Sequence, residues 1–310
     1  MEVQANREFW EKLIVTLGAE YRDDFRQNYS LTDVTSGNAI NAISRSTENH
    51  GIFLQGDWAA LETLRLNAGV RYDQYGNQDP GYNPRVALIY NPWKESTFKA
   101  IYGTAFRAPN FYELFDSRYQ DIKPETITSY ELIYDQGINQ HLHSTLSVFR
   151  NELNDLVTFS AGRFQNFDNA TAEGFEVGLD GSWSGGLRSR LSYTRQETED
   201  STTGLPLPEA PRHLIKAGVT VPVYQEKVFG SLEVLYTSTR PTLAGNSADA
   251  YTVVNFTLFT QKLLKGLEFS GSVYNLFGDR FFDPARPLLH RQDLIERDGR
   301  SFRLKMTYAF

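Results

Sequence analysis

The sequence predicts an all-β protein: a transmembrane, antiparallel, up-and-down β-barrel. Three observations predict this fold class. Apolar and polar residues alternate along most of the chain, short and long links alternate between those segments, and no apolar run is long enough for a membrane-spanning helix. Such a helix needs about 18 apolar residues, so any crossing must be made by strands, and only a closed barrel satisfies every backbone amide of a spanning sheet.

The last nine residues, FRLKMTYAF, show the alternation most clearly. Successive side chains of a strand point to opposite faces, so the apolar residues here share one face and Arg303, Lys305 and Thr307 share the other. The apolar row is Phe302, Leu304, Met306, Tyr308 and Phe310. One face of this strand therefore requires lipid or a protein core, and the other requires water.

The alternation recurs in segments 13–22, 64–73, 175–183 and 228–237, and several apolar rows end in Tyr or Trp. Charged residues occupy the opposite rows in mid-strand, where a packed core would not tolerate them unpaired. We therefore expect apolar rows to face lipid and charged rows to line a wet lumen. The expected lumen-facing charges are Arg71, Glu131, Glu176, Asp180, Arg188, Arg190 and Glu233. The alternative role for these charges is cross-strand ion pairing that keeps the wall soluble.

Composition agrees with a barrel and excludes other classes. Aromatic residues make up 14% of the chain, as interfacial girdles of Tyr, Trp and Phe would require. A net charge of −7 argues against a nucleic-acid-binding protein, which needs a basic surface. The chain has no cysteine, so it forms no disulfide framework and no thiolate metal site.

The alternating segments predict about 14 strands. Their ranges are 10–28, 50–59, 62–76, 84–92, 95–105, 126–136, 140–160, 163–184, 187–200, 211–223, 226–240, 250–262, 266–276 and 298–310. Long links are expected at 29–49, 106–125, 201–210, 241–249 and 277–297, and they alternate with short turns. In bacterial barrels the short turns are periplasmic, so the long loops should face outside the cell.

Several ordered segments resemble one family, the β-barrel portion of TonB-dependent outer-membrane receptors. These segments are 53–58, 68–73, 83–90, 102–115, 123–132, 174–178, 211–213, 273–280 and 299–310. Each is a weak motif alone, whereas their order and spacing together are specific. The resemblance implies an outer-membrane location in a Gram-negative bacterium and a C-terminal strand, 302–310, that is recognised by the barrel-assembly machinery.

The resemblance also implies a plug domain inside a roughly 22-stranded barrel, and coupling to a TonB-type energy transducer. We identify no plug in residues 1–310, which we interpret as one barrel domain, and the start MEVQANR has no apolar core typical of a signal peptide. The chain is thus expected to be part of the larger barrel or to close as a smaller one. The family implies uptake of a scarce small-molecule ligand, foremost a ferric siderophore or similar metal chelate.

Two expected outer loops carry candidate ligand-binding residues. Phe111, Tyr112 and Tyr119 present flat aromatic faces that suit an aromatic or catecholate ligand. Arg286, His290 and Arg291 lie beside apolar residues and suit an anionic chelate. The alternatives are aromatic residues that pack the first loop onto the rim, and ion pairs within the second loop. The segment 107–109 (Arg-Ala-Pro) ends a strand, and its expected role is structural because proline cannot continue a ladder.

Sequence motifs for catalysis are absent, so we expect neither an enzyme nor a resident cofactor or metal. There is no phosphate-binding glycine loop, no zinc-protease motif and no nucleophile elbow. His141 and His143 are expected on one face of a strand, where they would be solvated because no third metal ligand is evident. Two other functions stay open: a passive pore formed by these strands alone, and an enzyme at the barrel rim.

Overall fold

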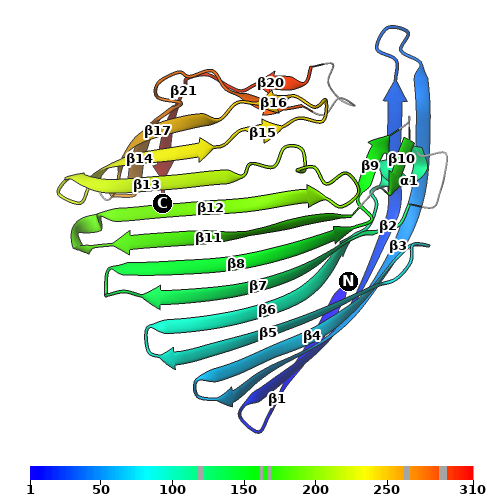
Figure 1. Cartoon of the computed structure of the whole chain (residues 1–310), viewed down its shortest axis with the longest axis horizontal. Helices are drawn as coiled ribbons and strands as arrows, with labels where there is room; N and C mark the ends of the chain where they lie inside the picture. The colour runs from blue at the N-terminus through cyan, green and yellow to red at the C-terminus, as the bar shows by residue number, and fades with distance from the viewer. Residues whose placement is uncertain (117–121, 161–162, 167–168, 262–264, 286–291, 310) are drawn as a thin grey trace.

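The computed structural model describes residues 1–310 except 117–121, 161–162, 167–168, 262–264, 286–291 and 310. Its main feature is one curved antiparallel sheet of 15 strands (Figure 1). Each strand of this sheet pairs with the strand of the sheet that comes next along the chain. The strands are β1 (Glu2–Phe9), β2 (Leu13–Thr32), β3 (Ala39–Leu61), β4 (Leu64–Tyr75), β5 (Gly81–Trp93), β6 (Ser96–Arg107), β7 (Glu125–Gly137), β8 (Leu142–Asn154), β11 (Ala170–Ser182), β12 (Arg188–Asp200), β13 (His213–Tyr224), β14 (Val228–Thr237), β17 (Tyr251–Thr260), β18 (Leu267–Tyr274) and β21 (Ser301–Tyr308). The predicted all-β antiparallel fold is confirmed.

The register explains why the alternating sequence forms this sheet. Tyr90 of β5 is opposite Phe98 of β6, and Phe98 is opposite Tyr134 of β7, so apolar rows of neighbouring strands continue one another. The rings of Phe98 and Tyr134 stack with their centroids 4.5 Å apart. The apolar rows lie on the outward face of the sheet, where Leu132 is 63% exposed and Leu304 is 90% exposed. A lipid bilayer is the environment that such a continuous exposed apolar face requires.

The strand list predicted above is wrong at three places. Residues 2–9 form an additional strand, β1, which pairs with β2 across a tight turn at Trp10 and Glu11, both with positive φ. Residues 29–49 are mostly the extended ends of β2 and β3 rather than a long loop. The ranges 140–160 and 163–184 are interrupted by a separate hairpin, β9 (Val157–Ser160) and β10 (Arg163–Asn166). The alternation of apolar and polar residues did not reveal these differences, because hairpins and loops outside the membrane show the same alternation as membrane-spanning strands.

The two ends of the sheet differ in what connects the strands. Short turns lie at one end, including the turn η1 (Ser184–Gly186). The other end carries α1 (Phe111–Asp116), the β9–β10 hairpin, β15 (Arg240–Pro241) with β16 (Ser247–Ala248), and β19 (Phe282–Pro284) with β20 (Leu294–Glu296) (Figure 1). This long-loop end forms an outer rim, as the predicted long links 106–125, 241–249 and 277–297 require.

The sheet is open, and its two edge strands run in the same direction. Among the described strands, β1 pairs only with β2, and β21 pairs only with β18 (Figure 1). Strand β1 therefore covers the segment of β2 that begins at Leu13, and the first edge of the sheet is β1 itself. Both β1, which ends at the turn 10–12, and β21, whose Tyr308 pairs with Leu267, run toward the short-turn end.

No helix within the described ranges combines the length and the apolar character that a membrane crossing needs.

Candidate functional site: the charged face and the outer rim

The face opposite the apolar rows carries charged side chains along the middle of the strands. The register places all seven sequence-predicted lumen residues in these inward rows: Arg71, Glu131, Glu176, Asp180, Arg188, Arg190 and Glu233. Several of them form local pairs. Arg71 donates to Glu20 at 2.7 Å and to Asp73 at 2.8 Å, and its guanidinium lies 5.7 Å from the ring centroid of Phe53.

Farther along this face, hydroxyl groups and an arginine side chain donate hydrogen bonds to the carboxylates. Ser147 donates to Glu131 and Thr194 donates to Glu176, each at 2.7 Å. Asp180 accepts from Arg190 at 2.7 Å. Since these partners occupy neighbouring strands, the carboxylates from β7 to β11 are held within the wall itself.

The wall from β12 to β21 is organised differently. A hydroxyl row crosses four strands and has an arginine at each end, because successive registers align the residues directly. The row is Arg188, Thr220, Ser231, Thr257, Ser272 and Arg303. Thr220 donates to Ser231 at 3.1 Å and Thr257 donates to Ser272 at 2.9 Å. Ion pairs of Arg188 and Arg303 are absent among the described residues, so both guanidinium groups remain available to a ligand or partner.

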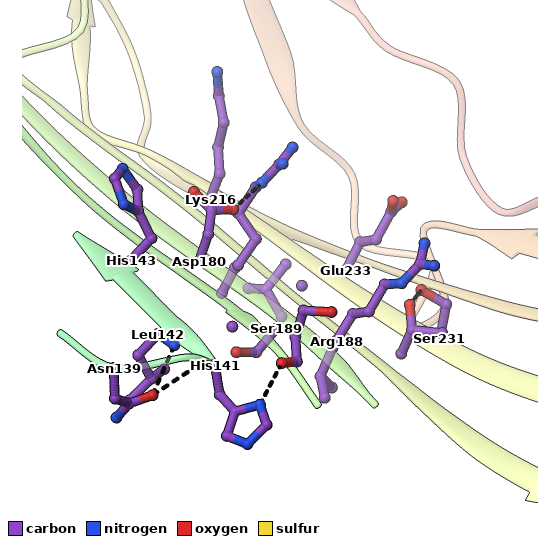
Figure 2. Close-up of a pocket in the computed structure, with 18 of the residues that line it drawn as sticks. Asn139, His141, Leu142, His143, Asp180, Arg188, Ser189, Lys216, Ser231 and Glu233 are labelled. Atoms are coloured by element: carbon purple, nitrogen blue, oxygen red, sulfur yellow. Dashed lines mark hydrogen bonds and ion pairs between the residues drawn. The ribbon is translucent and has the colours of Figure 1, made fainter. Parts of the chain in front are cut away.

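A hollow of about 970 Å³ lies on this wall near the short-turn end. Its lining includes Asp180, Arg188, Lys216 and Glu233. Figure 2 shows these four side chains with His143 on one side of the strands, whereas His141 points away from them. The hollow therefore presents cationic and anionic groups together, an arrangement that suits a polar or charged partner.

The two histidines do not form the expected pair. His141 precedes β8, and its ring lies 3.1 Å from the carbonyl oxygen of Ser182. His143 is on the charged face, 3.7 Å from Asp135. The expectation that both share one face of a strand is wrong, because β8 begins only at Leu142. Groups of three or more potential metal ligands are absent from the part of the chain that the structure describes.

Arg107 organises the first part of the outer rim. It donates to Glu125 of β7 at 2.6 Å and to Glu113 of α1 at 2.9 Å. Asn110 and Glu113 exchange hydrogen bonds between side chain and backbone at 2.9 and 2.7 Å, which is a capping box at the start of α1. Glu125 also accepts from the backbone N–H of Val157, so one arginine connects the loop to the β9–β10 hairpin. This is more than the strand-ending role expected for the segment 107–109.

Aromatic packing reinforces the same part of the rim. The ring of Tyr112 lies 4.7 Å from that of Tyr29 on β2 and 5.2 Å from that of Phe164 on β10. Phe164 in turn contacts Phe159 edge to face at 5.1 Å. Of the predicted aromatic ligand residues, Phe111 and Tyr112 lie on α1, and Tyr119 falls outside the described residues. Tyr112 thus takes part in packing the loops together.

Arg240 organises the second part of the rim. It is only 7% exposed, donates to Asp283 and to the carbonyl of Phe282 at 2.8 Å each, and lies 5.4 Å from the ring centroid of Tyr251. Thr242 and Asn246 donate to Asp293 at 2.8 and 2.9 Å. These bonds join the β15–β16 hairpin to the β19–β20 hairpin. The predicted cationic residues Arg286, His290 and Arg291 lie outside the described residues.

Sequence reasoning missed Glu113, Glu125 and Arg240. Asn110 followed three residues later by Glu113 is a recognisable capping signature. Nothing local in the sequence pairs Arg240 with Asp283, because 43 positions separate them.

The C-terminal strand lies at the edge of the sheet with its apolar row outward. Phe302, Leu304, Met306 and Tyr308 are 73%, 90%, 67% and 57% exposed, and Phe310 is outside the described residues. Their partners on β18 include Val273 and Phe269. Among the described strands β21 pairs with β18 alone, so its other side offers a backbone edge and an apolar surface to another strand.

Comparison with known proteins places this geometry in a family. A family model described as "TonB dependent receptor-like, beta-barrel" matches residues 2–276. The iron-regulated outer membrane virulence protein of Vibrio cholerae is 27% identical over 317 residues, which cover 91% of this chain and 47% of that protein. The vitamin B12 transporter BtuB of the same species is 28% identical over 207 residues, which cover 64% of this chain and 32% of that protein.

Solved structures share the fold at low sequence identity. A mutant of the ferric enterobactin receptor PfeA from Pseudomonas aeruginosa superposes with a TM-score of 0.80 at 18% identity, over 100% of this chain and 53% of that one. The copper transporter OprC gives 0.79 at 17% identity, over 97% of this chain and 54% of that one. The chain spans about half the length of the first curated relative and about a third of BtuB.

Proposed function

Because the chain belongs to the TonB-dependent receptor-like β-barrel family, whose relatives here are outer-membrane proteins of Gram-negative bacteria, we propose that it forms most of the barrel wall of an energy-coupled uptake receptor. Its ligand in this proposal is a ferric siderophore or similar metal chelate, taken up with a plug domain and a TonB-type transducer. The observation that carries the proposal is the pairing of a lipid-facing apolar wall with a charged inner face beneath an organised outer rim. Relatives named as iron-regulated proteins and receptors support the choice of ligand.

The inner face supplies the contacts that a luminal domain and a passing polar ligand would need. Arg188 and Arg303 have no ion-pair partner among the described residues, and hydroxyl groups fill the row between them. A folded domain with carboxylates at its surface would pair with these guanidinium groups, because charge-assisted hydrogen bonds are the strong ones. The same row would pass an anionic ligand once that domain moves.

The outer rim supplies the ligand contacts. In this proposal Arg286, His290 and Arg291 bind the negative charge of the chelate, and aromatic faces of the loop at Phe111, Tyr112 and Tyr119 contact its rings. The networks around Arg107 and Arg240 hold the neighbouring hairpins in place. A rigid supporting scaffold of this kind is what loop-borne binding sites require.

A passive pore made by the chain alone is the less favoured function. A self-closed sheet would pair β1 with β21, and these strands run in the same direction. The junction would be parallel, whereas bacterial single-chain barrels close with antiparallel neighbours. A rim enzyme is also disfavoured, because similar proteins are named as a vitamin B12 transporter, a ferric enterobactin receptor and a copper transporter.

The test is ligand binding to the chain together with the plug and the barrel strands that complete an antiparallel wall, reconstituted in nanodiscs, with a ferric tris-catecholate chelate and cyanocobalamin as probes. Isothermal titration calorimetry should report saturable binding of the ferric chelate and none of cyanocobalamin. An Arg286→Gln and Arg291→Gln double variant should bind roughly tenfold more weakly, as loss of about 1.4 kcal/mol implies.

Arg280→Gln is the matched control, because it removes an exposed arginine of the same outer loop that is already paired with Glu296. Binding of cyanocobalamin alone would reassign the ligand to the cobalamin class. Binding of neither probe, or equal losses in the control and the double variant, would contradict the proposed rim site.

A further inference from the structure

The outward face of the sheet carries an apolar groove that ends in a charged group. The groove has a volume of about 660 Å³ and crosses β5 to β8. Its outward-facing lining includes Val86, Leu88, Tyr102, Tyr130, Leu132 and Val148. The rings of Tyr102 and Tyr130 are 5.3 Å apart, and Leu132 and Val148 are 63% and 50% exposed. Such a surface on the lipid side of an outer-membrane barrel fits an acyl chain.

Arg150 lies at the long-loop end of this groove. It directly opposes Tyr130 on one side and Glu173 on the other, so its side chain belongs to the same outward row. The next outward residue on β8 toward the short-turn end is Val148, which lines the groove. Arg150 therefore marks the level at which the apolar surface gives way to polar surface on the extracellular side.

The guanidinium of Arg150 is paired with two carboxylates and still has donors to offer. Its Nε donates to Glu152 at 3.0 Å and its Nη1 donates to Glu173 at 3.3 Å. A guanidinium has five N–H donors, and within the described residues Nη2 makes no hydrogen bond. The side chain is 52% exposed. A phosphate oxygen is a matched acceptor for the remaining donors.

Two further arginines lie near the same level, Arg195 on β12 and Arg212 directly before β13. Arg195 and Arg212 each donate to Glu197 at 2.6 Å, and Glu197 opposes Glu173 in the register. A band of alternating acids and arginines thus runs along the extracellular boundary of the apolar face. In this band Arg150 is the arginine that lines the end of the acyl-sized groove.

We propose that this groove and Arg150 form a binding site for one anionic lipid of the outer leaflet. An acyl chain lies along Val86, Leu132 and Val148, and the headgroup phosphate binds the Arg150 guanidinium. This lipid-binding site is on the opposite face from the charged inner wall and requires no transported ligand. Lipid bound here would fix the height of β5 to β8 in the bilayer, because the phosphate and the apolar groove are held by one rigid wall. The occupant is a lipid rather than a free phosphate, since the groove supplies most of the contact.

The experiment is native mass spectrometry of the chain together with the barrel strands that complete an antiparallel wall, after reconstitution in phosphatidylcholine nanodiscs that contain equal amounts of dioleoyl phosphatidic acid and dioleoylglycerol. We expect the released chain to retain phosphatidic acid in preference to dioleoylglycerol. Arg150→Gln should retain roughly tenfold less phosphatidic acid, because the charged donor is lost. Val148→Trp should reduce retention by filling the groove while Arg150 stays in place.

Arg22→Gln is the matched control, since Arg22 is equally exposed at 53%, is paired with Asp24 at 3.1 Å, and belongs to the inward row. Glu173→Gln should increase the retention of phosphatidic acid, because it frees Nη1 of Arg150. This increase is opposite to the decrease expected for Arg150→Gln, and misfolding would not produce it. Equal retention in wild type and Arg150→Gln, or equal retention of the two lipids, would overturn the proposal. If inorganic phosphate displaced the phosphatidic acid and Val148→Trp had no effect on its retention, the site would bind free phosphate and not a lipid.

Discussion

Arg107 and Arg240 each connect several elements of the outer rim. Arg107 joins β6, β7 and α1, and Arg240 joins the β15–β16 and β19–β20 hairpins. Their environments differ, because Arg107 keeps 45% of its side chain exposed while Arg240 keeps 9%. Removing one partner of a buried pair leaves an uncompensated charge, so Arg240 is the more sensitive position.

Arg240→Gln should detach the two hairpins from each other. Among the described residues, Asp283 would keep Arg297 as its cationic partner, whose side chain is 58% exposed, and the carbonyl of Phe282 would lose its donor from Arg240. We expect a loss of roughly 1–3 kcal/mol in local stability, the cost of leaving buried polar groups unpaired. Limited proteolysis should show faster cleavage within 238–250, and Arg297→Gln should have a much smaller effect. Unchanged cleavage in Arg240→Gln would contradict this role.

At the scale of elements, the outer hairpins depend on ion pairs as well as on backbone pairing. The β19–β20 hairpin has only three residue pairs, from Phe282↔Glu296 to Pro284↔Leu294. Arg280 adds two hydrogen bonds to Glu296, of 2.6 and 2.8 Å. The hydrogen bond from Arg280 lowers the pKa of the Glu296 carboxyl below its ordinary value.

A carboxyl whose pKa is lowered in the folded state stabilises that state above its unfolded pKa, and the contribution is lost as pH falls through the folded pKa. The link between Arg280 and Glu296 should therefore persist at neutral pH and be released only in acid. Titration of Glu296 followed by carboxyl carbon NMR should give a midpoint below that of an unpaired glutamate, and Arg280→Gln should raise it. An identical midpoint in the variant would show that the pair is not formed in solution.

At the scale of the whole molecule, strand direction decides how the wall is completed. In an open sheet, the outer edges of β1 and β21 have no neighbouring strand among the described strands, and in lipid each backbone group left without a partner costs several kcal/mol. Because both edges run toward the short turns, antiparallel closure requires an odd number of further strands. Two copies in the same orientation do not meet this condition either, since β1 of one would again be parallel to β21 of the other.

The full chain refolded alone into bilayers should therefore give no steady open conductance and no compact, heat-modifiable band on electrophoresis. Addition of barrel strands that complete an antiparallel wall should produce the band. A stable conductance from the chain alone would refute this prediction and would favour the passive pore.

The sequence alone determined the fold class, the two faces and the outer-membrane family. Alternation is a local property, since each side chain's face depends only on its position along the strand, so Arg71, Glu176 and Leu304 could be assigned to faces without coordinates. Family motifs such as 102–115 added the identity, because their order along the chain is itself sequence information.

Only the tertiary structure decided the edge strand β1, the β9–β10 hairpin and the rim networks. Strand β1 has weak alternation and is recognised by its pairing with β2, which is a contact between segments. The bonds from Arg240 to Asp283 and the groove ending at Arg150 join residues that are distant in sequence or on different strands. Such contacts depend on how the sheet curves and how its loops meet, and no local pattern encodes that geometry.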